Sequence, residues 1–361
     1  MSRSSGPFRV ALTRDFLSPE GELLFGDIGL ELLDAGGGIA WEFLPEWRPE
    51  LGPELLREYD AVIVLGARLT RASLQAADRL ALVARFGVGY ENIDVQACTD
   101  HGIALTITPD GVRRPVATSM LLQVLALSYR LLEKDRLIRA GRWGEKLAYM
   151  GAGVTGRVLG LVGLGNIGAE LFRLARPLEM VHLAYDPYAR ADQTAELGVR
   201  LVDLPTLLRE SDYLCLACPL TPETHHLIGA AELALMKPSA YLVNSARGAV
   251  VHEAALVEAL RQGRIRGAAL DTFEEEPIDP HHPLLEMPNV ILTPHAIAWT
   301  DECFGGNGRS ACQNVLRVAR GAAPEHVVNR EVLASPAFLA KLRASAALAP
   351  GSTEGEGRQH D

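Results

Sequence analysis

Residues 158–168 read VLGLVGLGNIG, an apolar run that leads directly into a pattern of three glycines, Gly163, Gly165 and Gly168. The next residues, AELFRLARPL, continue with the spacing of an amphipathic helix. The first glycine permits a tight turn, the second lets a phosphate approach the backbone, and the third lets the helix pack closely on the strand. Free N–H groups at the helix N-terminus favour an anion. This strand, turn and helix predict a binding site for the pyrophosphate of a dinucleotide.

A carboxylate follows at the spacing that such a site requires. The next strand pattern, VHLAYD, ends at Asp186, and an acid about 20 residues beyond the glycines binds the ribose hydroxyls. A carboxylate at this point also repels a 2′-phosphate, so NAD is the expected cofactor and NADP the less favoured one. Arg190 lies close enough in the sequence to soften that preference.

Short apolar runs alternate with helical patterns on both sides of this stretch. The runs before it are FRVALT, IAWEFL, AVIVLG and ALVARFG, and those from it onward are VLGLVGLG, VHLAYD, YLCLACP, AYLVNSA, GAALDTF and VILTPHA. Strands that alternate with helices pair in parallel, and nearly continuous apolar runs are typical of strands covered on both faces. We therefore predict an α/β protein with two doubly wound parallel sheets.

Two long helical patterns suggest how the domains are divided. One covers residues 115–143 and is apolar on every side up to Leu132, which is typical of a helix buried between domains or subunits. The other covers about 301–319 and is expected to return to the first sheet. The predicted domains are 1–115 with 298–333 for the substrate and 116–297 for the cofactor. Residues 334–361, rich in Ala, Ser, Gly and Glu with one weak helix, are expected to form a flexible tail.

Composition argues against several other classes of protein. The 361 residues carry 35 Lys or Arg against 45 Asp or Glu, a net charge of −10 that does not suit a duplex-binding protein. No N-terminal stretch has the pattern of a signal peptide, and no run reaches the roughly 18 apolar residues of a membrane span. The five cysteines are too few and scattered for a disulfide framework. We expect a soluble cytoplasmic protein that binds neither nucleic acid nor membrane.

Polar side chains follow three predicted strands of the second sheet. Arg247 follows LVNSA, Asp271 and Glu276 stand in LDTFEEEP, and His295 follows LTP. Ligands of open α/β sheets bind beyond the carboxyl ends of the strands, so these groups should converge at the reacting end of the cofactor. An arginine fork suits a carboxylate, and an acidic neighbour raises the pKa of an imidazole, which makes it a better proton donor. The set fits a redox step on a ketone or hydroxy acid.

Six strings stand in the same order as in one known family: RFGVGYENID, GLVGLGNIG, CPLTPETHHLIG, LMKPSAYLVNSARGAVV, AALDTFEEEP and NVILTPHA. From Phe8 to Val328 the chain resembles the D-isomer-specific 2-hydroxyacid dehydrogenases. The resemblance implies a Rossmann-type cofactor domain inserted in a flavodoxin-like substrate domain. It also implies hydride transfer between NAD(H) and a D-2-hydroxyacid/2-oxoacid pair. In that reaction Arg247 would bind the carboxylate, His295 would be the general acid/base, and Glu276 would tune His295.

The resemblance further implies which residues line the binding sites. Backbone N–H groups of Val88 and Gly89 are expected to bind the substrate carboxylate. The cofactor-binding residues that it implies are Gly163, Gly165, Asn166, Ile167, Gly168, Asp186, Cys218, Pro219, Thr224, Ala246 and Asp271. No metal is expected, because the CxxC that ends at Cys218 lies on a predicted strand and the histidine pairs have no acidic partners at ligand spacing.

Several residues allow two interpretations. Taken singly, Arg247 could cap a strand end and Glu276 could be one of three solvated glutamates. Arg113 and Arg114 fit either a second anion site or a solvated helix start, and Trp299 fits either a pocket wall or interdomain packing.

Other functions retain part of the pattern. By resemblance, formate dehydrogenases place a glutamine beside the histidine, where this chain has Glu276, whereas phosphite oxidation keeps all three catalytic side chains. An NADH-sensing, corepressor-like regulator is the alternative from a different class, although the chain lacks a basic face or a long interaction arm. The predicted assembly is a homodimer formed through the apolar helix from Val116.

Overall fold

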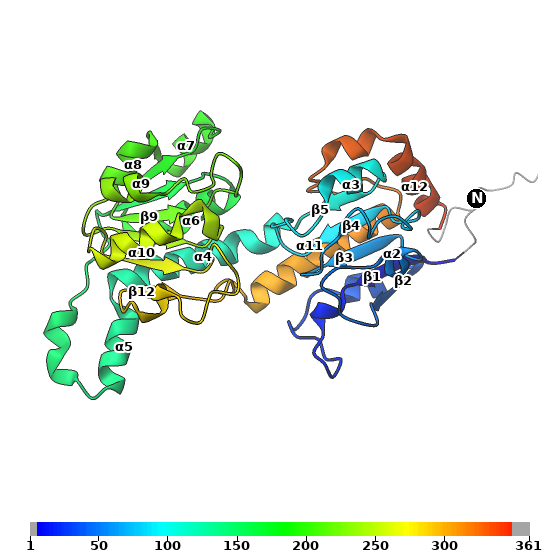
Figure 1. The fold of residues 1–361 in the computed structure, drawn as a ribbon. Coiled ribbons are helices and arrows are strands. Elements are labelled where there is room, and N and C mark those ends of the chain that lie inside the picture. The colour runs from blue at the N-terminus through cyan, green and yellow to red at the C-terminus, as the bar shows by residue number, and fades with distance from the viewer. Residues whose placement is uncertain (1–5, 349–361) are drawn as a thin grey trace, which may run out of the picture. The chain divides into compact units, whose positions relative to one another are not determined.

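The computed structural model describes residues 6–348 and divides into two compact units. One unit holds the residues up to Val112 and from Thr300 onward, and the other holds Arg113–Trp299. Each unit contains one sheet, and every pair of neighbouring strands in it is parallel. The colours of Figure 1 follow the chain from one unit to the other and back. The predicted α/β class is therefore confirmed.

The first unit is built on a five-stranded sheet with the order β2-β1-β3-β4-β5, the flavodoxin-like arrangement. Its strands are β1 (Phe8–Leu12), β2 (Ile39–Phe43), β3 (Ala61–Val64), β4 (Leu82–Arg85) and β5 (Ala104–Thr106). All four residues of β3 are buried, as expected for a central strand covered on both faces. The strand β5 is absent from the runs that the sequence pattern singled out, because it is only three residues long.

Short helices and the C-terminal helices surround this sheet. They are η1 (Arg14–Phe16), α1 (Glu31–Asp34), α2 (Pro53–Leu56), α3 (Val95–Asp100), α11 (Asp301–Ala319), η6 (Arg330–Ala334) and α12 (Pro336–Ala346). The long helix α11, orange in Figure 1, packs on β4 and α1. The chain therefore returns to the first sheet after the second one.

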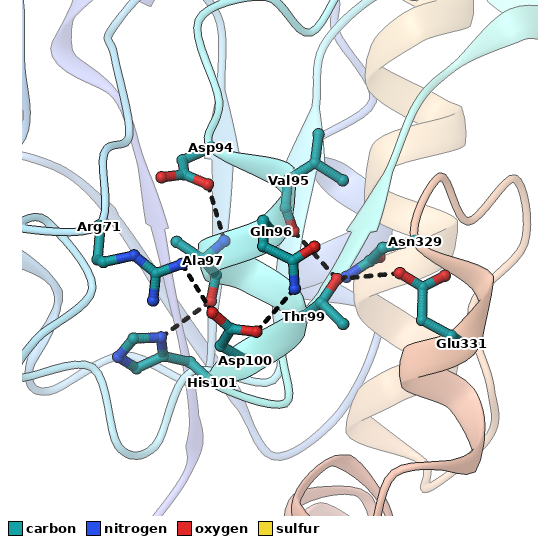
Figure 2. Close-up of polar contacts among 10 residues, drawn as sticks. All are labelled: Arg71, Asp94, Val95, Gln96, Ala97, Thr99, Asp100, His101, Asn329 and Glu331. Carbon is teal, nitrogen blue, oxygen red and sulfur yellow. Dashed lines mark hydrogen bonds and ion pairs between the residues drawn. The ribbon is translucent and has the colours of Figure 1, made fainter.

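A buried asparagine ties the segment after α11 to the first unit. Asn329 is 1% exposed and donates from Nδ2 to Thr99 Oγ1 and to the Ile103 carbonyl, at 3.0 and 2.9 Å. Its Oδ1 accepts from the Leu105 N–H at 2.9 Å. Thr99 also donates to Glu331 (3.3 Å), so the start of η6 lies beside α3, as Figure 2 shows.

The predicted flexible tail is wrong over Pro336–Ala346. These residues form α12, which packs on α11 and buries the Phe338 side chain completely. Ser335 caps the helix by accepting from the Phe338 N–H. The alanine-rich composition suggested a tail, but Phe338 and Leu342, four residues apart, place apolar side chains on one helical face. Residues 349–361 of the predicted tail lie outside the described residues.

The second unit is built on a seven-stranded sheet with the order β12-β11-β10-β9-β6-β7-β8. Its strands are β6 (Val158–Val162), β7 (Val181–Tyr185), β8 (Arg200–Leu201), β9 (Tyr213–Leu216), β10 (Tyr241–Asn244), β11 (Gly267–Leu270) and β12 (Val290–Leu292). Successive residues of β9 enter two different hydrophobic cores: Tyr213 and Cys215 one, Leu214 and Leu216 the other. Both faces of the sheet are thus covered, and the strand order reverses at β6, as in a Rossmann-type fold.

The helices of the second unit begin with an interrupted pair. They are α4 (Pro109–Ser128, which starts in the first unit), α5 (Leu131–Arg139), η2 (Trp143–Tyr149), α6 (Asn166–Ala175), η3 (Arg176–Leu178), α7 (Ala191–Leu197), α8 (Leu204–Glu210), α9 (Ala230–Leu235), η4 (Gly248–Val250), α10 (Glu253–Arg261) and η5 (Pro283–Glu286). No single helix within residues 6–348 is long and apolar enough to span a membrane; α4 and α5 reach that criterion only together, across a 58° bend.

The predicted single helix over 115–143 is wrong in its bounds. It begins at Pro109, and it stops after Ser128 because the Ser128 carbonyl accepts from the Ala152 N–H at 2.8 Å. Arg130 then adopts left-handed backbone with φ 53°, which no α-helix can continue through. Its guanidinium donates to the Ala148 carbonyl at 2.8 Å, so the returning segment fixes the break from both sides.

Candidate active site

The turn between β6 and α6 leaves the space that a dinucleotide phosphate needs. Gly163 has left-handed backbone (φ 93°), and a Cβ there would lie 2.8 Å from the Cys218 nitrogen. A Cβ on Gly168 would lie 2.4 Å from the Gly163 carbonyl oxygen, whereas the space beside Gly165 is open. No side chain caps the start of α6, so its first N–H groups are available to bind an anion at this turn. The residues present therefore fit a dinucleotide.

Asp186 connects the end of β7 to this glycine turn. Its Oδ2 accepts from the Leu164 N–H at 2.7 Å, and its Oδ1 accepts from the Tyr188 N–H at 2.8 Å. The carboxylate is thus fixed beside the glycine turn, where the sequence motif requires it. Arg190, four residues later, donates to both carboxylate oxygens of Asp192, at 3.1 and 2.5 Å.

The other sequence-predicted cofactor residues lie around the same strand ends. Asn166 and Ile167 form the first turn of α6, and Cys218 is buried beside Gly163. Pro219 and Thr224 belong to one closed loop, because Thr224 Oγ1 donates to the Pro219 carbonyl at 2.7 Å. Burial raises the pKa of the Cys218 thiol to about 11, so it stays neutral and acts as an apolar wall.

Arg247 lies in a turn that a buried asparagine holds from both sides. Asn244, the last residue of β10, is 1% exposed. Its Nδ2 donates to the Arg247 carbonyl at 2.9 Å, and its Oδ1 accepts from the Ala246 N–H at 3.1 Å. Asn244 therefore fixes the backbone from which both Ala246 and the half-buried Arg247 side chain project.

The structure brings Glu276 and His295 into direct contact. The Nδ1 atom of His295 lies 2.8 Å from Oε2 of Glu276, whose second oxygen accepts from the Phe273 N–H at 3.0 Å. His295 follows β12 and Glu276 follows β11, so the two side chains meet at the carboxyl ends of neighbouring strands. The His295 side chain is 50% exposed, which leaves the ring accessible to a small molecule.

This contact shifts both pKa values in directions that keep the pair charged. The hydrogen bond to Glu276 raises the pKa of His295, against the opposing effects of burial and of the Arg247 charge. For Glu276 the largest effect is desolvation, which raises the pKa of its carboxyl. Hydrogen bonds from His295 and Phe273 and the charges of His295 and Arg247 together outweigh desolvation, and the net pKa is lowered. Because each charge acts on the others, Arg247, Glu276 and His295 form one electrostatic group.

Asp271, predicted to contact the cofactor, also fixes the backbone around His295. Its Oδ1 accepts from the Thr293 hydroxyl at 2.6 Å and from the N–H groups of Ala296 and Ile297 at 3.0 and 3.1 Å. His295 itself adopts left-handed backbone with φ 52°, which costs energy for a non-glycine residue. Asp271 is 5% exposed, and its carboxylate offsets this strain through hydrogen bonds to residues on both sides of the histidine.

The predicted substrate loop, Val88 and Gly89, belongs to the first unit and follows β4. It begins at Gly87, whose φ of 126° is accessible to glycine. The Gly87 N–H donates to the buried Thr108 hydroxyl at 2.7 Å, and that hydroxyl lies 2.8 Å from Oδ1 of Asn307 on α11. Both loop residues are half-buried. The loop is therefore anchored at its first residue by a buried hydrogen-bond chain.

The remaining candidates differ in their surroundings. Arg114 pairs with Glu170 on α6 at 2.7 Å, while Arg113 and Trp299 are exposed. Cys215 is fully buried and its pKa is raised to about 12 by desolvation. Within the described part of the chain no group of three or more His, Cys, Asp or Glu side chains is arranged to hold a metal ion.

The sequence analysis missed the residues that fix the loops on which the predicted site residues lie. Asn244, Thr293 and Asn307 each make a buried or half-buried hydrogen bond that fixes one of the three loops. A polar residue at the end of an apolar strand was the available signal for Asn244 and Thr293. Asn307 gives no such signal, because its partner Thr108 is about 200 residues away in the chain.

Comparisons with known proteins agree with this arrangement. A sequence model described as "D-isomer specific 2-hydroxyacid dehydrogenase, NAD binding domain" matches residues 121–296. A glyoxylate reductase from Korarchaeum cryptofilum (strain OPF8) is 40% identical over 297 residues, 80% of this chain and 90% of that protein. A D-3-phosphoglycerate dehydrogenase from Archaeoglobus fulgidus is 38% identical over 280 residues, 76% of this chain and 53% of that protein.

A solved structure extends the similarity to both units. The NADPH-dependent glyoxylate/hydroxypyruvate reductase from Sinorhizobium meliloti aligns with a TM-score of 0.74 and 28% identity, over 89% of this chain and 97% of that one. These matches confirm the resemblance seen in the six sequence strings. The protein is an oxidoreductase that transfers a hydride between a nicotinamide dinucleotide and a 2-oxoacid/2-hydroxyacid pair. The chain belongs to the D-isomer specific 2-hydroxyacid dehydrogenase family.

Proposed function

We propose that this enzyme reduces a small 2-oxoacid of the size of glyoxylate to the 2-hydroxyacid, with NADH as the preferred reductant. The observation that carries the proposal is the 2.8 Å contact between His295 and Glu276 in the electrostatic field of Arg247. The substrate class is supported by the glyoxylate reductases among the relatives. The preference for NADH is supported by the Asp186 carboxylate beside the glycine turn and by the pairing of Arg190 with Asp192.

Each residue of the group has a distinct role in this reaction. Bound NADH supplies the hydride. Arg247 binds the substrate carboxylate through its planar fork and polarises the carbonyl. His295 donates a proton from Nε2 to the carbonyl oxygen, because Glu276 occupies Nδ1. Glu276 stabilises the imidazolium before that transfer, and Asp271 holds the His295 backbone in place.

Two further binding contacts belong to the proposal, one in each unit. The backbone N–H groups of Val88 and Gly89 bind the substrate carboxylate, a role supported by the anchoring of Gly87 to Thr108. The pyrophosphate binds over Gly165 at the start of α6, and Asp186 binds the adenosine ribose. Cys218, Pro219, Thr224 and Ala246 line the groove for the cofactor.

The test is the oxidation of NADH and of NADPH, in parallel, with glyoxylate, hydroxypyruvate, pyruvate, phosphohydroxypyruvate and a bulkier branched 2-oxoacid. We expect the highest kcat/KM with NADH and one of the two smallest substrates. If no oxoacid is reduced although NADH still binds, the enzyme assignment at this site is wrong and a regulatory, NADH-sensing role takes its place. If only phosphohydroxypyruvate is reduced, the proposed substrate size is wrong.

We also propose that the protein is a cytoplasmic homodimer that associates through the segment from α4 to η2. Trp143, Leu147 and Met150 are 66%, 85% and 78% exposed, and Leu131 and Ile138 of α5 are each 53% exposed. Apolar side chains gathered on one segment favour a partner surface. The five cysteines are free and buried, which suits a reducing compartment. Light scattering should give twice the chain mass, and the monomer mass would reject the dimer.

A further inference from the structure

Two glutamates and two histidines of the second unit join three segments to one another and to His282, the residue before η5. The segments are the loop Phe273–Pro277, the first turn of α10, and the turn around His226. Phe273 is 7% exposed, but residues 274–277 are exposed, so burial alone does little to fix this loop. Polar contacts must therefore hold the loop that carries Glu276.

The first of these contacts is a reciprocal pair between Glu274 and Glu253. The Glu253 N–H donates to Oε1 of Glu274 at 2.8 Å, and the Glu274 N–H donates to Oε2 of Glu253 at 3.2 Å. Glu253 is the first residue of α10, where N–H groups have no partner within the helix and a negative charge is favoured. Glu274 therefore acts as an external cap that attaches the loop to a helix N-terminus.

Two histidines keep these carboxylates in place. The Nε2 atom of His226 lies 2.9 Å from Oε1 of Glu274, and the Nε2 atom of His282 lies 3.1 Å from Oε1 of Glu253. Because Nδ1 of His282 accepts from the Leu284 N–H, the neutral ring carries its hydrogen on Nε2 and donates it to Glu253. His282 thus donates to the Glu253 carboxylate without having to be charged.

The same cluster joins the Arg247 turn to the Glu276 loop. The His226 N–H donates to the Ala249 carbonyl at 2.7 Å, two residues after Arg247. A Cβ at Gly248 would lie 1.9 Å from the Phe273 carbonyl carbon, so the two backbones are in direct contact. A shift of the Glu274 segment would therefore be transmitted to Glu276 on one side and to Arg247 on the other.

We propose that Glu274 is a positioning residue for proton transfer: its carboxylate anchors the Phe273–Pro277 loop to α10 and to His226, and thereby holds Glu276 against His295. The inference rests on the proposed function, because it assigns His295 the role of proton donor. It differs from a purely stabilising role, since a helix cap alone would not change the protonation of a histidine in another loop.

The test compares Glu274→Ala with Glu274→Gln and with the matched control Glu275→Ala, the exposed neighbour in the same loop. The first readout is the pKa of the His295 ring by NMR titration, with its signal assigned by its loss in His295→Asn; this readout needs no substrate. The charged groups that act on this ring are Glu276, Arg247 and Asp271, and all three are retained in every variant. The second readout is the pH profile of kcat and KM for oxoacid reduction.

In Glu274→Ala, we expect the pKa of His295 to fall towards its ordinary value of about 6.5 and kcat to drop by up to about 100-fold, the loss that a misplacement of roughly 1 Å can cause. Glu274→Gln keeps an oxygen that accepts from the Glu253 N–H, and it should restore most of both quantities. Glu275→Ala should match the wild type. If Glu274→Ala lowers the melting temperature but leaves the pKa of His295 and kcat unchanged, Glu274 is only a helix cap and the proposal is overturned.

A second variant decides the matter if Glu274→Ala does not fold. His226→Asn removes the contact with Glu274 and keeps a residue that tolerates the left-handed backbone at position 226, where φ is 53°. It should lower the pKa of His295 in the same direction, and an unchanged value would overturn the proposal. Failure of the proposed function is distinguishable, because it appears as a wild-type enzyme that reduces no oxoacid while the NMR comparison still gives a result.

Discussion

Oε2 of Glu276 and Nδ1 of His295 lie 2.8 Å apart, although the two residues follow different strands of the second sheet. This contact determines which nitrogen of the His295 ring can exchange a proton with a substrate. Glu276 occupies Nδ1, so proton exchange with a substrate has to take place at Nε2. The same contact raises the pKa of His295, which increases the fraction of the ring that is protonated at a given pH. This one hydrogen bond thus determines which ring nitrogen exchanges the proton, and it raises the pKa of the ring.

Replacement of His295 by asparagine should strongly reduce turnover and leave the fold intact. Asparagine tolerates the left-handed backbone at this position, where φ is 52°. General acid catalysis contributes roughly 10²- to 10⁴-fold, so kcat should fall by about that factor. NADH affinity, measured by fluorescence titration, should stay within a few-fold because the glycine turn is unaffected. Turnover that survives within a few-fold would mean that another group donates the proton.

The pH dependence of reduction should move when Glu276 is replaced by glutamine. Reduction needs the imidazolium, so the rate is fully present at low pH and is lost as the pH rises through the raised pKa of His295. Glutamine removes the negative charge, lowers that pKa, and shifts the loss of activity to lower pH. The reverse reaction needs the neutral ring and should show the opposite limb. Identical pH profiles for Glu276→Gln and the wild type would show that Glu276 does not raise the pKa of His295.

Replacement of Arg247 by lysine should cost activity even though the charge is kept. Lysine cannot donate two parallel hydrogen bonds to a carboxylate, and a charge-assisted bond contributes about 1.5–3 kcal/mol. We expect kcat/KM to fall by roughly 10- to 150-fold at that magnitude. The exposed Arg264, on the same unit, provides the control variant Arg264→Lys, which should be neutral. Equal activity of the two variants would show that the fork of Arg247 does not bind substrate.

Much of the fold could be predicted because its determinants are local. The glycine turn at Gly163 and the apolar strands each follow from patterns within a few residues. The break at Arg130 and the packing of α12 could not be predicted in this way. Ser128 ends its helix because Ala152 bonds to its carbonyl, and α12 is held by the burial of Phe338. Both outcomes depend on tertiary contacts that override helical spacing and composition.

The candidate site, like the fold, could be predicted only where its determinants are local in the sequence. Arg247, Asp271, Glu276 and His295 are visible in the sequence because each follows a strand or stands in a family string. The contacts that position them are not visible, because Asn244 and Thr293 act through hydrogen bonds whose partners only the fold brings together. The polar residues that follow the strands can be identified from the sequence as candidate reacting groups. Their positions relative to one another depend on buried polar neighbours, which the sequence does not reveal.

Cofactor preference should respond to Asp186 and to the pair Arg190–Asp192 separately. Asp186 is fixed by the N–H groups of Leu164 and Tyr188, and its charge opposes a 2′-phosphate. At 4 Å in water such a repulsion is about 1 kcal/mol, so Asp186→Ser should improve kcat/KM for NADPH relative to NADH by at least about fivefold. Arg190 contributes less while Asp192 accepts hydrogen bonds from its Nε and Nη2 atoms. Asp192→Asn weakens that pair, and the double variant should therefore favour NADPH more than the sum of the two single changes. Kinetics with both cofactors at matched ionic strength measure the effect, and additive changes in the double variant would show that Arg190 does not reach the 2′-phosphate.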